Sequence, residues 1–386
     1  MKLLYLIPHS PSSVGYDSVD EFIEYAAYHR RVCEALQENN VDVELVTLTQ
    51  FDRESRTVNE IKVETYPVTV GSSFGWEISI QLIRRLISER DVDIIHIHGY
   101  NQPNAIPYLA VALRSGTTIV QNHGSSLDMS NIKHKLWYHT ITPLLRRSDA
   151  VLSVDQDEIK NLSPMLGEST KLYHLPNAVN PERFCPASQE KCRDKLGLDQ
   201  NSNYGLYVGR LTEEKGVMQL IDSMSQLDLA ELNLKLLLVY SGGSDEYIEE
   251  LKVRIAEAGI GNNIKWVGPV EHDCISNYYN AADFCVFPSI SEGFGVVVLE
   301  AMACETPVIA SDEHRAGGHV NEGENCLIVN PTSPDTIANA IQRLMSDRER
   351  CAEIANQGRE TVLQYYSYDA VIIDLIDIYH QVNDNH

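Results

Sequence analysis

The stretch DFCVFPSISEGFGVVVLEAMACETPVIASD, residues 283–312, decides the fold. Residues 283–288 form a short apolar run that is typical of a buried strand. Gly293 and Gly295 then interrupt the chain, and residues 296–303 have the apolar spacing of a helix. A strand, a glycine turn and a helix in this order predict an α/β domain.

Two glutamates flank this turn, Glu292 on the loop and Glu300 about one turn into the helix. The free backbone N–H groups and the positive dipole end near Gly295 favour an anion such as phosphate. A carboxylate in the helix can accept two hydrogen bonds from a ribose diol, and one on the loop can bind sugar hydroxyls or a developing positive charge. The alternative is that Glu292 is a solvated loop residue and Glu300 an ordinary acid near a helix start.

The string PSISEGFGVVVLEAMACETPVIAS closely resembles the donor-binding signature of the family 4 retaining glycosyltransferases. The shared features are two glutamates with seven residues between them, Phe-Gly after the first, and Glu-Ala-Met-Ala at the second. The resemblance implies that Gly293, Phe294, Gly295 and Glu300 bind a nucleotide-sugar donor and that Glu292 acts at the transferred sugar. Glu305 stands where the family usually has glycine.

The composition fits two domains of ordinary size, because the chain has 386 residues, of which 43% are hydrophobic and 22% charged. The formal net charge of −24 argues against a nucleic-acid partner. The eight cysteines include no C-x-x-C pair, which favours a reducing compartment. No apolar run approaches the length of a membrane span, and the chain starts directly in a strand, so we expect a cytoplasmic protein.

The first half alternates strands and helices, with strands expected at 3–7, 41–48, 61–70, 92–97 and 117–121 and helices at 19–38 and 78–90. Ligands of doubly wound sheets collect beyond the carboxyl ends of such strands. His98 and His123 follow two of them, and an imidazole can hydrogen-bond to a sugar hydroxyl in either protonation state. The alternatives are a structural hydrogen bond for His98 and a strand-capping role for His123.

The resemblance implies ligand-binding roles for residues at the carboxyl ends of these strands. His123, followed by glycine, matches a family histidine that reaches the transferred sugar. The loop after the first strand contains only Gly15, where the family commonly has a pair of glycines. We therefore treat Gly15 and His98 as weaker candidates for contacts with the acceptor.

We expect no metal ion. His96 and His98 are taken to point to opposite faces of a strand, so that they could not share an ion. Asp91-Val92-Asp93 and Asp155-Gln156-Asp157 look like the D-x-D motif that carries manganese in a different glycosyltransferase architecture. The first lies at the wrong end of its strand, and the second stands where the resembled family usually has serine.

Residues 131–147, NIKHKLWYHTITPLLRR, contain four Lys or Arg and no acid, although the chain as a whole is strongly acidic. Apolar residues lie between the basic ones, so the segment could contact a membrane surface or an acceptor that carries a lipid phosphate. The alternative is a helix packed on the sheet with its basic face in solvent.

The second half begins near the proline-bounded turn at residues 176–181, where alternation restarts with strands at 204–208, 234–240 and 264–267. The phrase after the first of these strands starts at Gly209, where the backbone can approach a ligand closely. Arg210 can bind a phosphate through two hydrogen bonds, and Lys215 adds a point charge. An isolated Arg near a Lys is usually solvated surface, but the whole phrase resembles the diphosphate-binding loop of the family.

The sequence therefore predicts two facing doubly wound Rossmann-like domains, which the resemblance identifies as the GT-B architecture. We expect an acceptor domain at 1–177 plus 369–386, to which the last helix crosses back, and a donor domain at 178–368. The resemblance implies a retaining, metal-independent hexosyltransferase that uses a nucleotide sugar, with a glycan, lipid-linked or small-molecule acceptor. The alternatives are an epimerase or hydrolase of nucleotide sugars with this architecture and a catalytically silent nucleotide-sugar-binding subunit.

Overall fold

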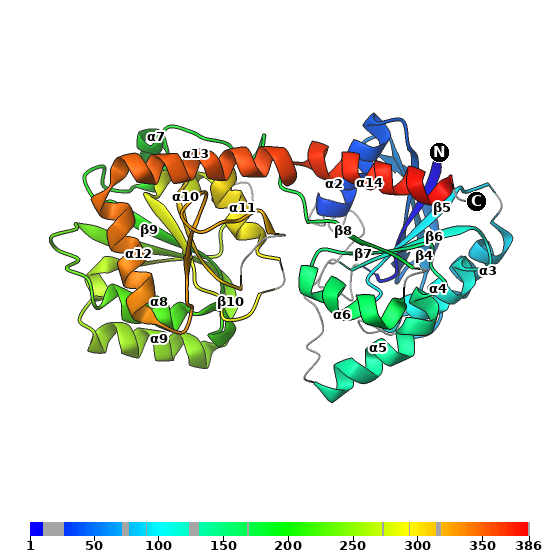
Figure 1. Ribbon diagram of the computed structural model, residues 1–386, viewed down its shortest axis with the longest axis horizontal. Helices are drawn as coiled ribbons and strands as arrows, with labels where there is room; N and C mark the ends of the chain where they lie inside the picture. The colour runs from blue at the N-terminus through cyan, green and yellow to red at the C-terminus, as the bar shows by residue number, and fades with distance from the viewer. Residues whose placement is uncertain are drawn as a thin grey trace. The chain divides into compact units, whose positions relative to one another are not determined.

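The computed structural model describes residues 1–10, 27–71, 77–89, 91–122, 131–167, 170–271, 274–292, 294–313 and 318–384 (Figure 1). Residue contacts divide the chain into two units. Unit 1 comprises Met1–Ala178 and Tyr368–His386, and unit 2 comprises Val179–Ser367. These boundaries lie one residue from those expected from the sequence. Each unit is a parallel-sheet α/β domain, so the expected doubly wound fold is confirmed.

Unit 1 is built on an eight-stranded sheet in the order β3-β4-β2-β1-β5-β6-β7-β8. Every neighbouring pair is parallel except β3 and β4, which are antiparallel. The strands are β1 (Lys2–Ile7), β2 (Asp42–Thr49), β3 (Glu54–Val58), β4 (Ile61–Pro67), β5 (Ile94–His98), β6 (Thr117–Asn122), β7 (Ala150–Ser153) and β8 (Lys171–His174). The edge strand β3 was not expected, because its sequence ESRTV is polar and it buries none of its side chains fully.

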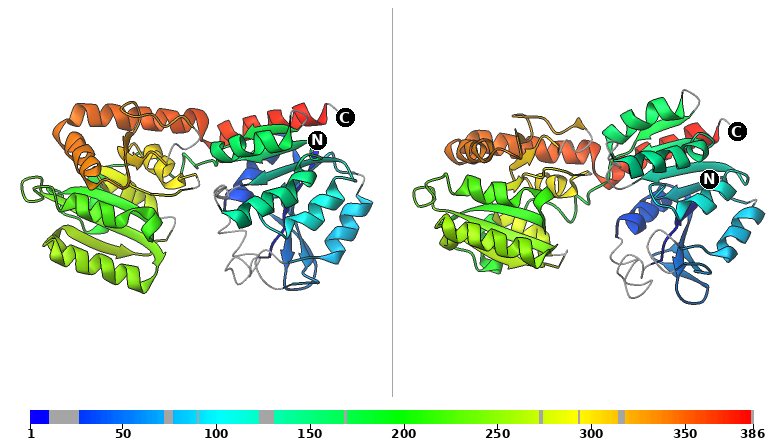
Figure 2. Two further views of the ribbon diagram at one scale, coloured as in Figure 1. Left: turned by 60° about the horizontal axis from the view of Figure 1, so that its bottom comes forward. Right: turned by 90° about the horizontal axis from the view of Figure 1, so that it is seen from below.

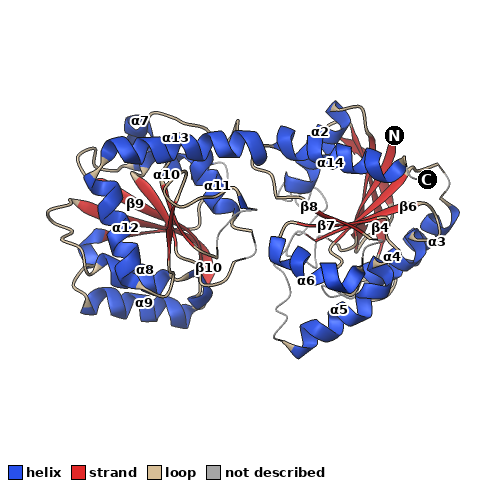
Figure 3. Ribbon diagram, viewed as in Figure 1, coloured by secondary structure: helices blue, strands red, loops and turns tan. Residues whose placement is uncertain are grey.

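The helices of unit 1 cover both faces of this sheet (Figure 3). They are α2 (Ala27–Glu38), α3 (Ile80–Ser88), α4 (Ala105–Ala112), α5 (Ile132–Leu145), α6 (Gln156–Leu166) and α14 (Tyr368–Asn383). Because side chains alternate along a strand, Leu3 and Tyr5 of β1 pack in the core with α2 and α14, whereas Leu4 and Leu6 pack with α3 to α6. The last helix therefore completes the core of unit 1, as expected.

Unit 2 has a six-stranded, fully parallel sheet in the order β11-β10-β9-β12-β13-β14. Its strands are β9 (Asn203–Leu211), β10 (Leu234–Gly243), β11 (Ile264–Gly268), β12 (Phe284–Phe287), β13 (Val308–Ser311) and β14 (Leu327–Val329). Strand β9 is longer than expected and includes Gly209 and Arg210, because Gly209 and Leu211 still pair with β10.

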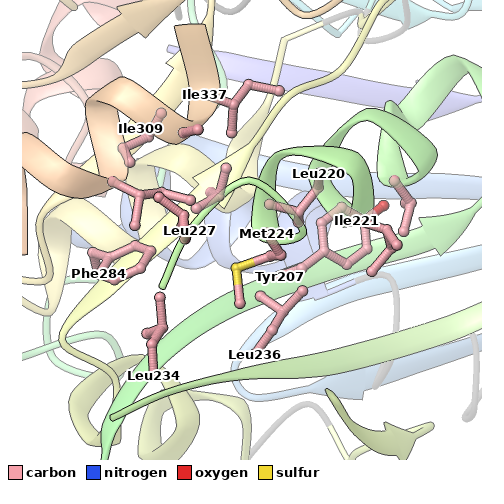
Figure 4. Close-up of a cluster of buried hydrophobic side chains, with 14 of the residues drawn as sticks. Tyr207, Leu220, Ile221, Met224, Leu227, Leu234, Leu236, Phe284, Ile309 and Ile337 are labelled. Carbon is pink, nitrogen blue, oxygen red and sulfur yellow. The ribbon is translucent and has the colours of Figure 1, made fainter. Parts of the chain in front are cut away.

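Helices also cover both faces of this second sheet (Figure 2). They are α7 (Gln189–Leu196), α8 (Val217–Met224), α9 (Asp245–Glu257), α10 (Ile275–Ala281), α11 (Val296–Ala303), α12 (Pro334–Ser346) and α13 (Arg348–Tyr365), with short 3-10 turns η2 (Glu213–Lys215) and η3 (Gly261–Asn263). Leu220 and Met224 of α8 pack with Leu236 and Phe284 of the sheet in the main core (Figure 4). Helices α10 and α11 contact other strand residues of the sheet.

None of the described helices has the length and hydropathy of a membrane span.

Candidate functional site

The strand order of unit 2 reverses between β9 and β12. From β9 the chain moves outward through β10 to β11, and from β12 it moves the other way through β13 to β14. A crevice beyond the carboxyl ends of the strands at such a reversal is the usual ligand site of a doubly wound sheet. The segment after β9 and residues 288–292 after β12 both start at this edge, so the fold brings the two motifs found in the sequence together.

The backbones of the two loops are joined directly. The N–H groups of Ile290 and Ser291 both donate to the carbonyl oxygen of Glu214, at 2.8 and 3.2 Å. Gly216 has φ +66°, and a Cβ placed there would lie 1.9 Å from the carbonyl oxygen of Pro288. Only glycine fits this position, because the main chain of the other loop occupies the space of a side chain.

Lys215 and Glu292 form an ion pair across these loops. The Nζ atom of Lys215 lies 2.5 Å from Oε2 of Glu292, and the two side chains are 14% and 19% exposed. The hydroxyl of Ser289 donates to the same oxygen at 3.4 Å. The structure therefore brings together two residues that the sequence places 77 positions apart. Their partial burial makes the pair less screened than a surface pair.

Arg210 lies on the same edge with its side chain more open to solvent. Its Nη2 atom donates to Glu214 at 2.8 Å, and the two side chains are 59% and 50% exposed. Such an exposed pair is weak and leaves the guanidinium available to a stronger anion. The hydroxyl of Tyr207 donates to the carbonyl oxygen of Arg210 at 2.7 Å and fixes the backbone there. A Cβ at Gly209 would lie 2.8 Å from this hydroxyl, which explains the glycine.

Helix α11 starts at the carboxyl end of β12, with Gly295 in the left-handed conformation as its N-cap at φ +78°. Within the described residues, no side chain caps this helix end. Its first backbone N–H groups and its dipole therefore supply positive potential at the same edge as Lys215. The neighbouring Phe294 is buried and meets Tyr366 edge-on at 6.2 Å between ring centroids, so it anchors the loop.

Glu300 is on α11 and is 7% exposed. The hydroxyl of Tyr279, on α10, donates to its Oε2 atom at 2.9 Å. Burial raises the pKa of Glu300 to about 7, while the Tyr279 hydrogen bond and the charge of Arg183 act in the opposite direction. The carboxyl group is therefore poised to change its charge near neutral pH, and hydroxyl donors from a ligand would favour the ionised form.

Glu305 follows α11 in the turn where the resembled family usually has glycine. Its φ of +56° is left-handed. Its N–H donates to the carbonyl oxygen of Met302, and the N–H of Thr306 donates to that of Ala301. These two bonds form a Schellman motif, so the turn keeps its geometry with a non-glycine residue at the strained position.

Three predicted site residues, Gly15, His123 and Gly293, lie outside the described residues.

His98 is described and is 2% exposed. Its ring packs at a tilt against the rings of Tyr5 and His96, with centroids at 4.0 and 4.2 Å. The expectation that His96 and His98 point to opposite faces is wrong, because residues two apart in a strand share a face. Among the described residues, no group of three or more potential ligands could hold a metal ion.

Both D-x-D motifs have structural roles in unit 1. The side chain of Asp155 caps α6 and accepts from the N–H groups of Asp157 and Glu158 at 2.7 and 3.4 Å. Asp93 accepts from the N–H of Lys2 at 2.7 Å and so joins β1 to the start of β5. The N-cap role of Asp155 is enough to explain why an aspartate stands at the start of the second motif.

A buried carboxylate fixes the carboxyl ends of β6 and β7. Glu158 is 0% exposed. It accepts hydrogen bonds from Asn122 at 3.1 and 2.9 Å and from Tyr138 at 2.7 Å. Ser153 also donates to it. Burial raises the pKa of Glu158. The interaction orders Asn122, the last residue of β6.

Sequence reasoning missed four residues around the unit 2 site: Arg183, Glu214, Ser289 and Tyr279. Glu214 lies between Arg210 and Lys215 in the motif, so a role as their hydrogen-bond or ion-pair partner could have been considered. No sequence signal identifies Tyr279 as the partner of Glu300, because the two residues meet only through the packing of α10 against α11.

Comparisons with known proteins identify two matching families. Residues 188–361 match the family described as Glycosyl transferases group 1, and residues 26–183 match Glycosyltransferase Family 4. An uncharacterized glycosyltransferase of Methanocaldococcus jannaschii is 26% identical over 92% of this chain and 93% of its own length. A GDP-mannose-dependent alpha-(1-6)-phosphatidylinositol monomannoside mannosyltransferase of Mycobacterium tuberculosis is 26% identical over 85% of each chain.

Two solved structures have the same fold over the full chain. Sucrose-phosphate synthase from Thermosynechococcus elongatus superposes with a TM-score of 0.77 at 23% identity, and the match covers 100% of both chains. Anabaena HepE, solved in complex with UDP, superposes with a TM-score of 0.76 at 19% identity and covers 99% of this chain and 100% of its own. At these identities the likeness concerns the fold alone.

Proposed function

The chain belongs to the glycosyl transferases group 1, and from this premise we propose that it moves a hexose-type sugar from a nucleoside diphosphate sugar to an acceptor hydroxyl. We propose that the transfer retains the anomeric configuration and needs no metal ion. The observation that carries this proposal is the ion pair of Lys215 and Glu292 at the strand-order reversal of unit 2. In this proposal, Lys215 would be the cation for phosphate and Glu292, beside it, the carboxylate for the sugar.

The donor diphosphate would bind between Lys215, Arg210 and the first N–H groups of α11. These groups come from three different segments that meet at one sheet edge, and two of them carry full positive charge. Anabaena HepE was solved with UDP and with UDP-glucose, which supports a nucleotide-sugar donor in a fold of this kind. Gly209 and Gly295 would let the main chain approach the ligand.

In the proposed reaction, the bond between the anomeric carbon and the diphosphate oxygen breaks, and the acceptor oxygen bonds to the same face of the sugar. The acceptor proton passes to a phosphate oxygen of the departing diphosphate, so no protein general base is required. Lys215, Arg210 and the α11 end meet the negative charge that grows on the leaving group. Glu292 interacts with the sugar as its ring gains positive charge.

Glu300 would accept hydrogen bonds from the ribose diol. Its place about one turn into α11 supports this role, and its pKa of about 7 in the free protein would fall as hydroxyl donors bind the charged form. Because ionisation and ribose binding would favour each other, nucleotide affinity should rise with pH through this range.

The acceptor would bind to unit 1, with His98, His123 and Gly15 as candidate contacts. Relatives of this chain are named for different acceptors, including phosphatidylinositol monomannoside and D-inositol 3-phosphate. The proposal therefore covers glycan, glycolipid and polysaccharide biosynthesis. We place the reaction in the cytoplasm, since all eight cysteines are free thiols, as is usual in a reducing compartment.

The test is an assay with UDP-, GDP- and ADP-sugars and a mixed acceptor extract in excess EDTA. The expected result is acceptor-dependent release of one nucleoside diphosphate and, by NMR, a product with the anomeric configuration of the donor. Release without acceptor would identify a hydrolase, and binding without turnover would identify a silent subunit. Activity that returned only with manganese or magnesium would contradict metal independence.

A further inference from the structure

The first two turns of α5 present an apolar strip to solvent on unit 1. Ile132 is 72% exposed and Leu136 is 61% exposed, although most large aliphatic residues of the unit are buried. The two residues are one helical turn apart and so lie on the same face. The opposite face, with Tyr138 and Ile141, is buried in the core. The exposure of the strip is therefore not a result of loose packing of the helix.

Lysines border this strip on both sides. Lys133 and Lys135 are exposed, and the helical spacing places one on each flank of the line from Ile132 to Leu136. No Asp or Glu occurs anywhere in residues 131–147. The N-terminal dipole end of α5 adds positive potential at the same place. Arg146, near the other end of the helix, is held by hydrogen bonds to the carbonyl oxygen of Met165.

Exposed aliphatic residues on two other helices have the opposite electrostatic surroundings. Val253 of α9 is 56% exposed, and four glutamates and one arginine line the same surface: Glu246, Glu249, Glu250, Glu257 and Arg254. Ile373 of α14 is 55% exposed and is followed by Asp374. Compared with these, the strip on α5 combines apolar exposure with positive charge.

We infer that the first two turns of α5 dock on an anionic lipid surface, with Ile132 and Leu136 inserted at the headgroup boundary and Lys133 and Lys135 on lipid phosphates. Exposed apolar side chains beside Lys or Arg are the combination with which surface helices contact an anionic lipid interface. The net charge of the chain does not prevent this contact, because charges further than about 8 Å from the surface are screened at physiological salt.

The helix is placed to deliver this contact to the acceptor side of unit 1. α5 is the first described helix after β6, and in a doubly wound sheet such a helix starts from the carboxyl edge of the strands. Figure 1 shows the first turns of α5 at the margin of unit 1. The inferred acceptor class is therefore a hydroxyl compound carried on a membrane lipid. That part rests on the proposed glycosyl transfer, whereas the membrane contact does not.

The experiment is co-sedimentation of the full chain, without substrates, with vesicles of phosphatidylcholine alone or mixed with phosphatidylglycerol. Binding is expected only to the anionic vesicles and should weaken with added salt. Lys133→Gln with Lys135→Gln should lower the partition constant about fivefold for each lysine. Ile132→Ser with Leu136→Ser should lower it by at least about tenfold, whereas Val253→Ser should behave as the wild type.

Three outcomes would overturn the inference: no binding to anionic vesicles at low salt, equal binding by the Ile132→Ser, Leu136→Ser variant, or self-association that depends on these two residues. Nucleotide binding by each variant is measured in parallel. A chain that binds nucleotide but no vesicles would refute the membrane contact alone. A chain that binds vesicles without transferring sugar to any lipid acceptor would keep the membrane contact and refute the acceptor class.

Discussion

The ammonium nitrogen of Lys215 and a carboxylate oxygen of Glu292 lie 2.5 Å apart, in loops that follow two neighbouring strands of unit 2. Each residue is thus the partner of the other before any ligand arrives. In the proposed reaction, a diphosphate that binds Lys215 would replace or share this partner, and Glu292 would then turn toward the sugar. In the proposed reaction, the pair would link donor binding to the placement of the carboxylate at the sugar ring.

We expect Glu292→Gln to separate nucleotide affinity from turnover. The affinity for the bare nucleoside diphosphate should be unchanged or tighter, because the variant removes the negative charge of residue 292 that competes with the diphosphate for Lys215. Turnover with the full nucleotide sugar should fall by roughly 10²-fold, since the developing charge on the ring loses its carboxylate. Calorimetry for the diphosphate and steady-state kinetics for the sugar measure the two effects.

The matched control for this variant is Glu249→Gln, which removes the exposed pair of Glu249 with Lys252 on α9. It should change neither quantity. If Glu292→Gln lost diphosphate affinity in proportion to turnover, Glu292 would face the nucleotide instead of the sugar.

Glu300 should make the stability of unit 2 depend on pH. Its folded pKa of about 7 lies above the ordinary value of 4.5, so the folded protein holds a proton that the unfolded chain releases in this range. Stability should therefore fall as the pH rises from 4.5 to 7. Glu300→Gln removes this loss of stability, because the amide does not titrate, and its oxygen still accepts the hydrogen bond from Tyr279. The free energy of unfolding of the variant should therefore exceed that of the wild type by an amount that grows between pH 5.5 and pH 8, to on the order of 3 kcal/mol.

Calorimetric Tm values of both proteins at pH 5.5 and pH 8 provide the measurement. An equal difference in Tm at the two pH values would show that the carboxyl group of Glu300 does not titrate in this range.

Replacing Glu305 by glycine should stabilise the turn after α11. The left-handed φ of +56° costs a residue with a Cβ about 1–2 kcal/mol, and part of the gain is lost to the greater freedom of glycine in the unfolded chain. The variant also loses the ion pair with Arg359 at 3.5 Å. We expect a net gain of about 0.5–1 kcal/mol for Glu305→Gly in chemical unfolding.

Glu305→Ala serves as the control, because it loses the same ion pair but keeps the Cβ. It should be no more stable than the wild type. Equal stability of the glycine and alanine variants would mean that the backbone strain is negligible.

The sequence was sufficient for the doubly wound folds and for helix α11, whose expected bounds match the structure. These features depend on local apolar spacing and on glycine, which a sequence displays directly. Strand β3 was missed because an exposed edge strand buries little apolar surface. The face shared by His96 and His98 was misassigned, although the two-residue period of a strand determines it.

Much of the site geometry depends on contacts between distant segments, which local patterns do not show. The motifs containing Lys215 and Glu292 were recognised separately, but only the adjacency of β9 and β12 joins them as a pair. The raised pKa of Glu300 comes from burial under α10, a property of packing. The exposure of Ile132 and Leu136 likewise required the structure, since the sequence also allowed a helix with these residues inward.

The most direct test of the account is a thermal-shift titration of the wild type and of Lys215→Met with UDP, GDP and ADP. A ligand that binds only the native state raises Tm. We predict that one of the three nucleotides stabilises the wild type and that Lys215→Met loses most of this shift at the same concentration. The control Lys252→Met, whose lysine forms an exposed pair on α9, should keep it. Stabilisation of Lys215→Met equal to that of the wild type, or no stabilisation of the wild type by any of the three, would contradict a diphosphate site at Lys215.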